Sequence, residues 1–271
     1  MPAAYAHYRF GQLMLSRLPA EKQKIIQVHR ALYDMGLQGP DLLFHYRPLS
    51  HDPLKGTGSR MHEAPAEAFF RPAGERLGRS RDSDALLAYL WGFLCHFALD
   101  FHCHPYIDAA EAAGGPGHLA MEADFDRALL AEAGLPVAPA STAGHIKLSR
   151  KNARLICVLF PGVSARQLHM AAVTMGLNQR LLSSQRPLVR GLVTSALKLF
   201  GCYEKLGPMM LRSRLDPRCA ESSRQLAVCF AQAQDTALRL MEAFQASAHG
   251  IQNYAPLYQY NYDAQIKEVT P

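Results

Sequence analysis

The sequence predicts an all-α protein, built as a single bundle of helices. Apolar residues recur with helical spacing along most of the chain. Alternating runs of β-branched residues flanked by Asn-Gly or Asp-Gly turns, which would indicate hairpins, are not found. Prolines such as Pro19, Pro161 and Pro187 fall between the periodic segments, where a residue without an amide hydrogen costs least. Helices joined by loops satisfy all three observations.

Prolines and capping residues delimit the predicted helices. Asp82 or Ser83 can cap the fourth helix and Ser164 the seventh, because their side-chain oxygens can accept hydrogen bonds from the first free amides. No internal repeat or low-complexity linker divides the chain, so residues 1–271 are predicted to form one domain. In order, the predicted helices cover residues 10–17, 20–35, 65–75, 83–102, 118–133, 147–160, 164–184, 188–206 and 221–248.

Length and composition indicate an ordinary globular protein. The 271 residues are 49% apolar and 19% charged, which excludes a disordered, collagen-like or wholly coiled-coil chain. The net charge of +6 comes from scattered Lys and Arg residues without a block of five, so we expect no stable complex with nucleic acid. We also expect no strongly amphipathic basic helix that would dock the chain on a membrane. The sequence does not indicate an oligomeric state.

Three features favour a cytoplasmic location. The longest apolar stretch, residues 85–95, is shorter than the roughly 18 residues that a membrane-spanning helix needs, so no transmembrane segment is expected. The first 15 residues lack the basic and apolar regions of a secretory signal. The six cysteines contain no CxxC pair and are predicted to be free thiols.

The strongest chemical signal lies in segment 83–105, which is apolar on nearly every face and is therefore predicted to be buried on all sides. It nevertheless contains His96, Asp100 and His104, which project from one face because they are spaced four residues apart. His118 and Glu122 repeat that spacing in the next helix. Buried imidazoles and carboxylates are costly unless paired or bound to a cation. These five residues are ligand types that Zn²⁺ prefers, and they predict a buried metal site.

Other interpretations apply to each residue alone. A single histidine and carboxylate four residues apart is more often a surface ion pair or a hydrogen-bonded core histidine than a metal site. Two such pairs together with His104 favour the metal. His102 points away from the others and is predicted to be structural or exposed to solvent, and Asp108, Glu111 and Asp124 are predicted to be solvated charges.

Five motifs follow one another along the first 130 residues. They are YAHYRFG at 5–11, GLQGPDLLFHYRPL at 36–49, MHE at 61–63, HFALDFHCHP at 96–105 and HLAMEADFD at 118–126. This series resembles the zinc-dependent phospholipase C family, which is similar in fold and metal site to the P1-type nucleases. It is similar in particular to a cytoplasmic bacterial branch that lacks a signal peptide. The resemblance covers about residues 5–130, and residues 142–271 support it only by being helical.

The resemblance implies a helical bundle that holds a cluster of up to three zinc ions. Asp41 and His62 would join His96 and Asp100 around the first ion. Asp41 is also the implied catalytic residue, because it could orient or deprotonate the attacking water, although it could equally be a ligand only.

The remaining implied ligands belong to a second and a third ion. His104, His118 and Glu122 would hold the second. Asp100 would bridge the first ion to the third, whose other ligands would include His7. Two ions are therefore predicted, and a third depends on whether its site is complete.

The sequence departs from the family at the third ion. In secreted relatives the mature N-terminal tryptophan chelates that zinc, whereas this chain starts Met1-Pro2 and has its only tryptophan at Trp91. Removal of Met1 would leave the secondary amine of Pro2, five residues before His7. The alternative for His7 is a surface residue beside an aromatic cluster.

The implied function is that of a phosphoester hydrolase of phospholipase C type, in which water activated by zinc attacks a phosphodiester. The implied substrate is phosphatidylcholine or a related phospholipid. Two alternatives stay open: a P1-nuclease-like nucleotidase or phosphomonoesterase, and a non-catalytic helical protein with structural metal ions. Arg47, Lys55 and Arg60 lie between Asp41 and His62 and could contact substrate phosphate, but solvated loop charges are the preferred interpretation.

The C-terminal part, residues 142–271, is predicted to pack against the metal-bearing helices. Its rows of Met and Leu are interpreted as core, and its tail, YAPLYQYNY at 254–262, as a packed terminal strap rather than part of a ligand pocket or a dimer contact. The core row consists of Leu168, Met170, Met175, Leu177 and Leu181.

Overall fold

The computed structural model describes residues 4–48, 50, 52–248 and 256–266. These residues are mostly helical, and the only β contact among them is an isolated antiparallel bridge between Tyr260 and Ile266. The predicted all-α fold is confirmed, and all six cysteines are free. Met1, Pro2 and Tyr254 lie outside the described residues.

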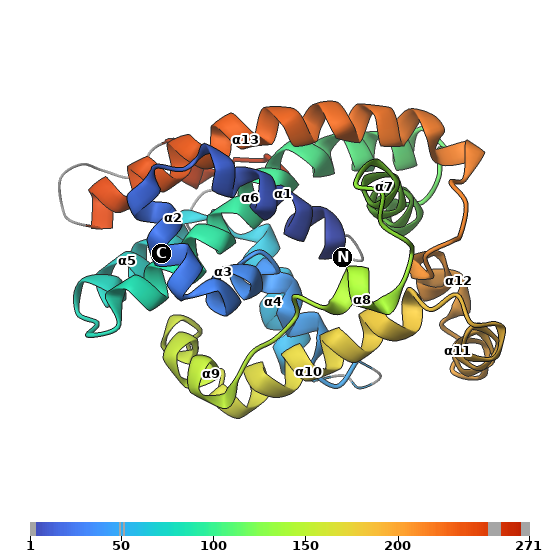
Figure 1. Ribbon diagram of the computed structural model, residues 1–271, viewed down its shortest axis with the longest axis horizontal. Coiled ribbons are helices and arrows are strands. Elements are labelled where there is room, and N and C mark those ends of the chain that lie inside the picture. The colour runs from blue at the N-terminus through green and yellow to red at the C-terminus, as the bar shows by residue number, and fades with distance from the viewer. Residues whose placement is uncertain (1–3, 49, 51, 249–255, 267–271) are drawn as a thin grey trace.

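Thirteen α-helices and five short 3₁₀ helices are present in the described part of the chain (Figure 1). The α-helices are α1 (Ala4–Arg17), α2 (Ala20–Val28), α3 (Arg30–Gly36), α4 (Pro53–Glu63), α5 (Glu67–Gly78), α6 (Ser83–Ala112), α7 (His118–Glu132), α8 (Pro139–Ala143), α9 (Arg150–Ile156), α10 (Ala165–Leu182), α11 (Pro187–Leu199), α12 (Tyr203–Leu206) and α13 (Ala220–Ala248). The 3₁₀ helices are η1 (Gly39–His45), η2 (Cys157–Leu159), η3 (Gly207–Met209), η4 (Pro217–Cys219) and η5 (Pro256–Gln259).

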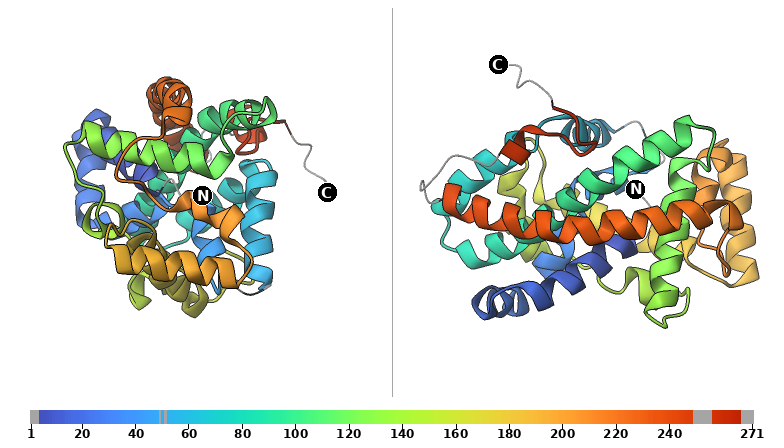
Figure 2. Two further views of the ribbon diagram at one scale, coloured as in Figure 1. Left: turned by 90° about the vertical axis from the view of Figure 1, so that its right-hand side faces the viewer. Right: turned by 90° about the horizontal axis from the view of Figure 1, so that it is seen from above.

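Helix α6 forms the centre of the bundle, with α13 and α3 packed along it (Figures 1 and 2). Every residue from Ala85 to Asp100 is buried, as its apolar composition predicts. By length and composition alone α6 could cross a membrane, but 89% of its most apolar window is covered by the rest of the protein, as in the core helix of a globular fold.

Two glycines let α3 and α6 touch backbone to backbone. A Cβ atom on Gly36 would lie 2.1 Å from the carbonyl oxygen of Tyr89, and one on Gly92 would lie 2.2 Å from that of Tyr33. Any larger residue at either position would therefore push the two helices apart. This contact matters for the site because η1, which carries Asp41, follows directly after α3.

Several helices differ from the predicted limits. The segment predicted as 20–35 is broken at His29 into α2 and α3, and α6 continues through Pro105, an exposed residue, to Ala112. Helix α4 was not predicted because Pro53 and two glycines indicated a loop. Pro53 instead occupies the first turn, where no amide is needed, and the side chain of Asp52 accepts a hydrogen bond from the Leu54 amide at 3.0 Å. The predicted Ser164 cap of α10 is confirmed.

The C-terminal helices are less buried than predicted. Leu168 and Met175 of α10 are in the core, but Met170, Leu177 and Leu181 are exposed, so the prediction for these three is wrong. They lie on the opposite side of the helix, because they are offset from the buried row by two residues or by six. Helix α11 has no buried residue.

The tail is a packed strap over its described residues, 256–266. Tyr258 and Tyr262 are buried, and the hydroxyl of Tyr258 donates a hydrogen bond to the carbonyl oxygen of Leu240 at 2.7 Å. The amide of Ala66 donates to the carbonyl oxygen of Tyr260 at 2.9 Å. The preferred interpretation of the tail is therefore confirmed for this part.

Candidate metal centre

The eight predicted ligands come together from five elements, η1 and helices α1, α4, α6 and α7. Their donor atoms form three groups in which each atom lies within 4.8 Å of the others. The groups are Asp41 with His62 and His96, His104 with His118 and Glu122, and His7 with His96 and Asp100.

The first group lies where η1 and α4 meet α6. Nε2 of His62 is 3.0 Å from Oδ1 of Asp41, and Nε2 of His96 is 3.9 Å from the same oxygen. Gly39 makes this approach possible: its φ is +48°, and a Cβ atom there would lie 2.2 Å from the His96 ring. The backbone turn that delivers Asp41 therefore depends on a glycine.

Asp100 is the centre of the whole arrangement. Its Oδ1 is 3.3 Å from Nε2 of His7 and 3.6 Å from Nε2 of His104, and its Oδ2 is 3.0 Å from Nε2 of His96. The same Oδ2 lies 3.9 Å from Nε2 of His62. One carboxylate thus contacts histidines of all three groups, which is the position of a bridging ligand.

The second group lies where α6 and α7 diverge. Nε2 of His118 is 3.3 Å from Oε1 of Glu122, and Nε2 of His104 is 3.9 Å from that oxygen. Asp108 and Glu111 are exposed as predicted, but both contact His118. Oδ1 of Asp108 is 3.4 Å from its Nδ1, and the carboxylate of Glu111 accepts a hydrogen bond from its amide at 3.1 Å.

Zinc fits the first group because its donor atoms are close together without being hydrogen bonded. Nε2 of His62, Nε2 of His96 and Oδ1 of Asp41 are buried, and none has a hydrogen-bond partner among the described residues. Nδ1 of His62 and Nδ1 of His96 point at carbonyl oxygens, those of Gly58 at 2.8 Å and Leu37 at 3.2 Å. A proton on each Nδ1 leaves the Nε2 lone pair available, as a metal ligand requires.

The charges of the cluster favour deprotonated carboxylates. Burial alone would raise the pKa of Asp100, but His96, His104 and His7 outweigh it and hold that pKa well below its usual range. Burial also opposes protonation of His104, yet Asp100 and Asp263 raise its pKa to about 9. The carboxylates therefore attract positive charge into a buried site, which a divalent cation would supply.

Asp263 and Tyr262, in the C-terminal strap, belong to the site but were not predicted from the sequence. Oδ1 of Asp263 is 2.9 Å from Nδ1 of His104, which fixes the ring so that Nε2 faces Asp100. The ring of Tyr262 packs on His62 with centroids 4.9 Å apart, and its amide donates to the carbonyl oxygen of His62 at 3.2 Å. The tyrosine-rich tail indicated packing, but no local spacing links it to residues more than 150 positions earlier.

Two further carboxylates hold α7 in place. Asp126 is buried and accepts hydrogen bonds from the amides of Tyr5 at 3.2 Å and Ala6 at 2.7 Å, which fixes the first turn of α1 beside His7. Asp124 was predicted to be a solvated charge, and that prediction is wrong.

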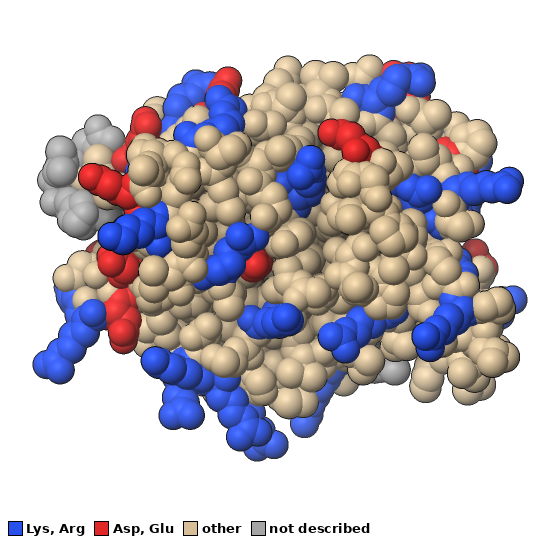
Figure 3. Space-filling view, in the orientation of Figure 1, with Lys and Arg blue, Asp and Glu red and all other residues tan. Residues whose placement is uncertain are grey.

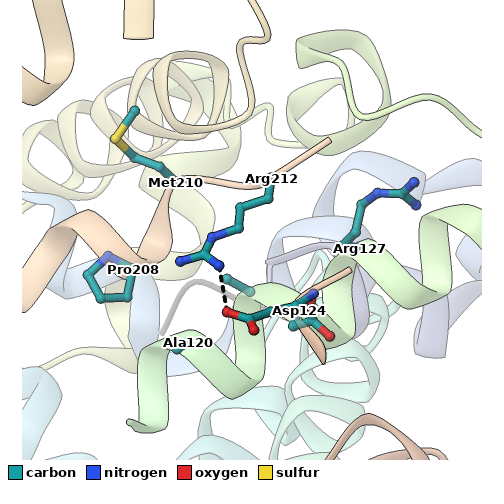
Figure 4. A pocket seen from close by; sticks show the side chains of 8 residues that line it. Ala120, Asp124, Arg127, Pro208, Met210 and Arg212 are labelled. Atoms are coloured by element: carbon teal, nitrogen blue, oxygen red, sulfur yellow. Dashed lines mark hydrogen bonds and ion pairs between the residues drawn. The ribbon is translucent and has the colours of Figure 1, made fainter. Parts of the chain in front are cut away.

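Asp124 is buried because it links α7 to the C-terminal part of the chain. It accepts hydrogen bonds from the Asp216 amide at 2.7 Å and from Oγ of Ser223 at 3.1 Å. Asp124 and Arg212 both line a small pocket of about 20 Å³, in which Arg212 pairs with Asp216 (Figure 4). The pocket is one water in size and does not adjoin the metal groups.

The other predicted residues have structural roles. Nε2 of His102 lies 2.8 Å from Oγ1 of Thr236, which confirms a structural histidine. Nζ of Lys55 donates to the carbonyl oxygen of Ser50 at 2.6 Å, and Arg47 and Arg60 are exposed. Arg47 lies in a loop, as the preferred interpretation predicts, but Lys55 and Arg60 belong to helix α4, so the predicted loop position is wrong for these two.

The fold and the site define an all-helical protein with a buried, carboxylate-bridged cluster of histidines. Residues 6–158 match the family model described as zinc dependent phospholipase C, and the chain belongs to that family. The match includes all eight predicted ligands and ends before α10, α11 and the strap. Comparison with curated proteins and with solved structures gives no match. Phospholipases C hydrolyse phosphoester bonds. Membership of the family therefore groups this chain with the zinc-dependent hydrolases.

Proposed function

We propose that the protein is a zinc-dependent phosphodiesterase that hydrolyses phospholipids to diacylglycerol and a phosphorylated headgroup. The observation that carries the proposal is the set of buried, unbonded donor atoms on Asp41, His62 and His96 beside the bridging carboxylate of Asp100. Membership of the family supports hydrolysis of a phosphoester. The cytoplasmic location expected from the sequence stays part of the proposal.

The proposed ligand assignment follows the three groups of donor atoms. Asp41, His62 and His96 would hold one zinc ion, and His104, His118 and Glu122 would hold a second. Asp100 would bridge toward His7, where a third ion would require a further chelator. Zinc lowers the pKa of water to near 7 and neutralises charge on phosphodiester oxygens.

Side chains of the protein activate the water molecule and keep the metal ligands in position. Burial alone would raise the pKa of Asp41, but His62 and His96 hold it below its ordinary value, so the carboxylate is deprotonated and can orient a water molecule or accept its proton. Asp263 keeps the His104 ring fixed, and Asp126 does the same for the helix that carries His7. These contacts limit the movement of the ligands during the reaction.

The test combines metal content with a panel of substrates. We expect about two zinc ions per chain by elemental analysis, and hydrolysis of a short-chain phosphatidylcholine that is soluble as a monomer. Single-stranded nucleic acid and nitrophenyl phosphate are the comparison substrates. Asp41→Asn should lower the rate by roughly 10²-fold or more, whereas Asp84→Asn, an exposed change on α6, is the matched control.

Two results would contradict the proposal. Zinc content far below one per chain, without rebinding of added zinc, would remove the metal chemistry. Full zinc content with no turnover of any phosphoester would instead indicate structural metal ions. Faster turnover of nucleic acid or nitrophenyl phosphate than of the lipid would reassign the substrate.

A further inference from the structure

Helix α11 exposes a row of leucines to solvent. Leu188, Leu192 and Leu199 are 83%, 73% and 83% exposed. Their spacing of four and seven residues places them on one face, and Phe200, just beyond the helix, is also exposed. Isolated exposed leucines are ordinary, but a helix that turns a whole row of them outward leaves an apolar surface without a partner.

Helix α10, which precedes α11, has the same property on its outer side. Met170, Val173, Leu177 and Leu181 are exposed and recur every three or four residues. The inner side of α10 is already used, because Leu168 and its buried neighbours pack toward η1. Packing within the protein therefore buries one apolar side of α10 and leaves the other side exposed to solvent. The exposed rows of α10 and α11 are called the α10–α11 face below.

All charged residues in the sequence around these rows are cationic. From Ala133 to Tyr203 the chain has no Asp or Glu. In Figure 3, Lys and Arg side chains line the lower edge of the molecule, where Figure 1 places α9 and α10, whereas Asp and Glu gather at its left and upper parts. The cations of this segment are Lys147, Arg150, Lys151, Arg154, Arg166, Arg180, Arg186, Arg190 and Lys198.

We propose that the α10–α11 face binds the surface of a bilayer that contains anionic lipids. Apolar rows flanked by Lys and Arg suit the boundary between headgroups and acyl chains, where the leucines are buried and the cations meet lipid phosphates. A second copy of the chain would bring the same positive charge to the contact. A nucleic acid would match the charge but leave the leucines in water. This proposal replaces the expectation that no strongly amphipathic basic helix docks the chain on a membrane.

The position of α10 connects this surface with the metal centre. On its inner side Nδ2 of Asn178 lies 3.0 Å from Nδ1 of His45, which is in η1 four residues after Asp41. Because α10 is a single helix, about 10 Å across, a bilayer on its outer side would lie roughly one helix diameter from η1. The inference deepens the proposed function, since it brings the hydrolase to its lipid, but binding itself requires no turnover.

The experiment measures how much of the zinc-loaded full chain sediments together with lipid vesicles at low temperature. Vesicles of phosphatidylcholine with phosphatidylglycerol should bind the protein more tightly than phosphatidylcholine alone, and added salt should weaken the binding. Leu188→Ser, Leu192→Ser and Leu199→Ser combined should reduce the affinity about tenfold or more. Arg166→Gln with Arg180→Gln should remove the preference for anionic vesicles.

The matched control replaces three other exposed apolar residues, Val28→Ser, Val228→Ser and Ile266→Ser, and should bind vesicles like the unchanged chain. All variants should hydrolyse the soluble short-chain lipid at the same rate as the unchanged chain. Vesicle binding without this hydrolysis would contradict the proposed function but would still support the proposed docking surface.

Three outcomes would overturn the docking proposal. The first is vesicle binding that the leucine substitutions leave unchanged. The second is a dimer in solution that those substitutions dissociate, which would make the face a contact between copies. The third is binding of single-stranded nucleic acid that exceeds vesicle binding and depends on Arg166 and Arg180 alone.

Discussion

Helices α6 and α11 are both rich in apolar residues, but their environments are opposite. Helix α6 is buried from Ala85 to Asp100 and contains polar side chains where only apolar ones are expected. Helix α11 has no buried residue and exposes leucines where polar side chains are expected. Each arrangement costs free energy in the isolated chain.

The two proposals account for this difference by what each helix would bind. Buried carboxylates and imidazoles become favourable with a cation between them, and exposed leucines become favourable against lipid. The first helix lies within the part that matches the family model, and the second lies beyond it. The two proposals therefore place metal chemistry and membrane attachment in different parts of one chain.

The largest expected effect is on the polar centre of α6. Asp100→Ala removes the carboxylate that contacts histidines of all three groups. We expect zinc content to fall and the rate to drop roughly a thousandfold, which corresponds to about 4 kcal/mol of transition-state stabilisation. Elemental analysis and the short-chain lipid assay measure both. Full zinc occupancy in this variant would show that the bridging role is misassigned.

A smaller effect separates the apolar residues of the two helices. Leu90→Ala in α6 leaves a cavity in the core and should lower the free energy of unfolding by about 2–5 kcal/mol. The same substitution at Leu192 in α11 should change it by less than about 0.5 kcal/mol. Urea unfolding of both variants checks the pair. A large loss at Leu192 would mean that α11 is covered in solution, for example by a second copy.

The smallest expected effect lies at the strap that closes the metal centre. Asp263→Asn keeps the shape of the side chain but removes its charge from Nδ1 of His104. Zinc affinity should fall roughly 10–100-fold, measured by competition with a chelator, while Gln259→Ala on the exposed side of the same strap should change nothing. Unchanged affinity in Asp263→Asn would limit this residue to packing.

The sequence predicts the polar row of α6 well, because four-residue spacing is a local property of a helix. His96, Asp100 and His104 share a face in the structure as they do in the pattern. Helix α4 was not predicted, although it carries His62, since Pro53 and its neighbouring glycines are more typical of loops. The resemblance to a known family identified His62 where the pattern of residues did not.

Two kinds of information were missing from the sequence. Periodicity shows that α10 has an apolar row but not which of two rows faces the core, so Met170, Leu177 and Leu181 were assigned to the wrong side. Contacts across long chain separations have no local signature, which is why Asp263 was not predicted. Asp124 was misjudged for the same reason, because Asp216 and Ser223, which bury it, lie more than 90 residues later.

The contact between Asp263 and His104 also has a consequence for synthesis of the chain. The two residues are 159 positions apart, so the ribosome makes the partner of His104 on the order of 10 s after His104 itself. Until then the nascent chain has histidines and carboxylates for zinc but lacks the group that fixes one of them. The metal centre can therefore take the form seen in the structure only after translation has passed the strap.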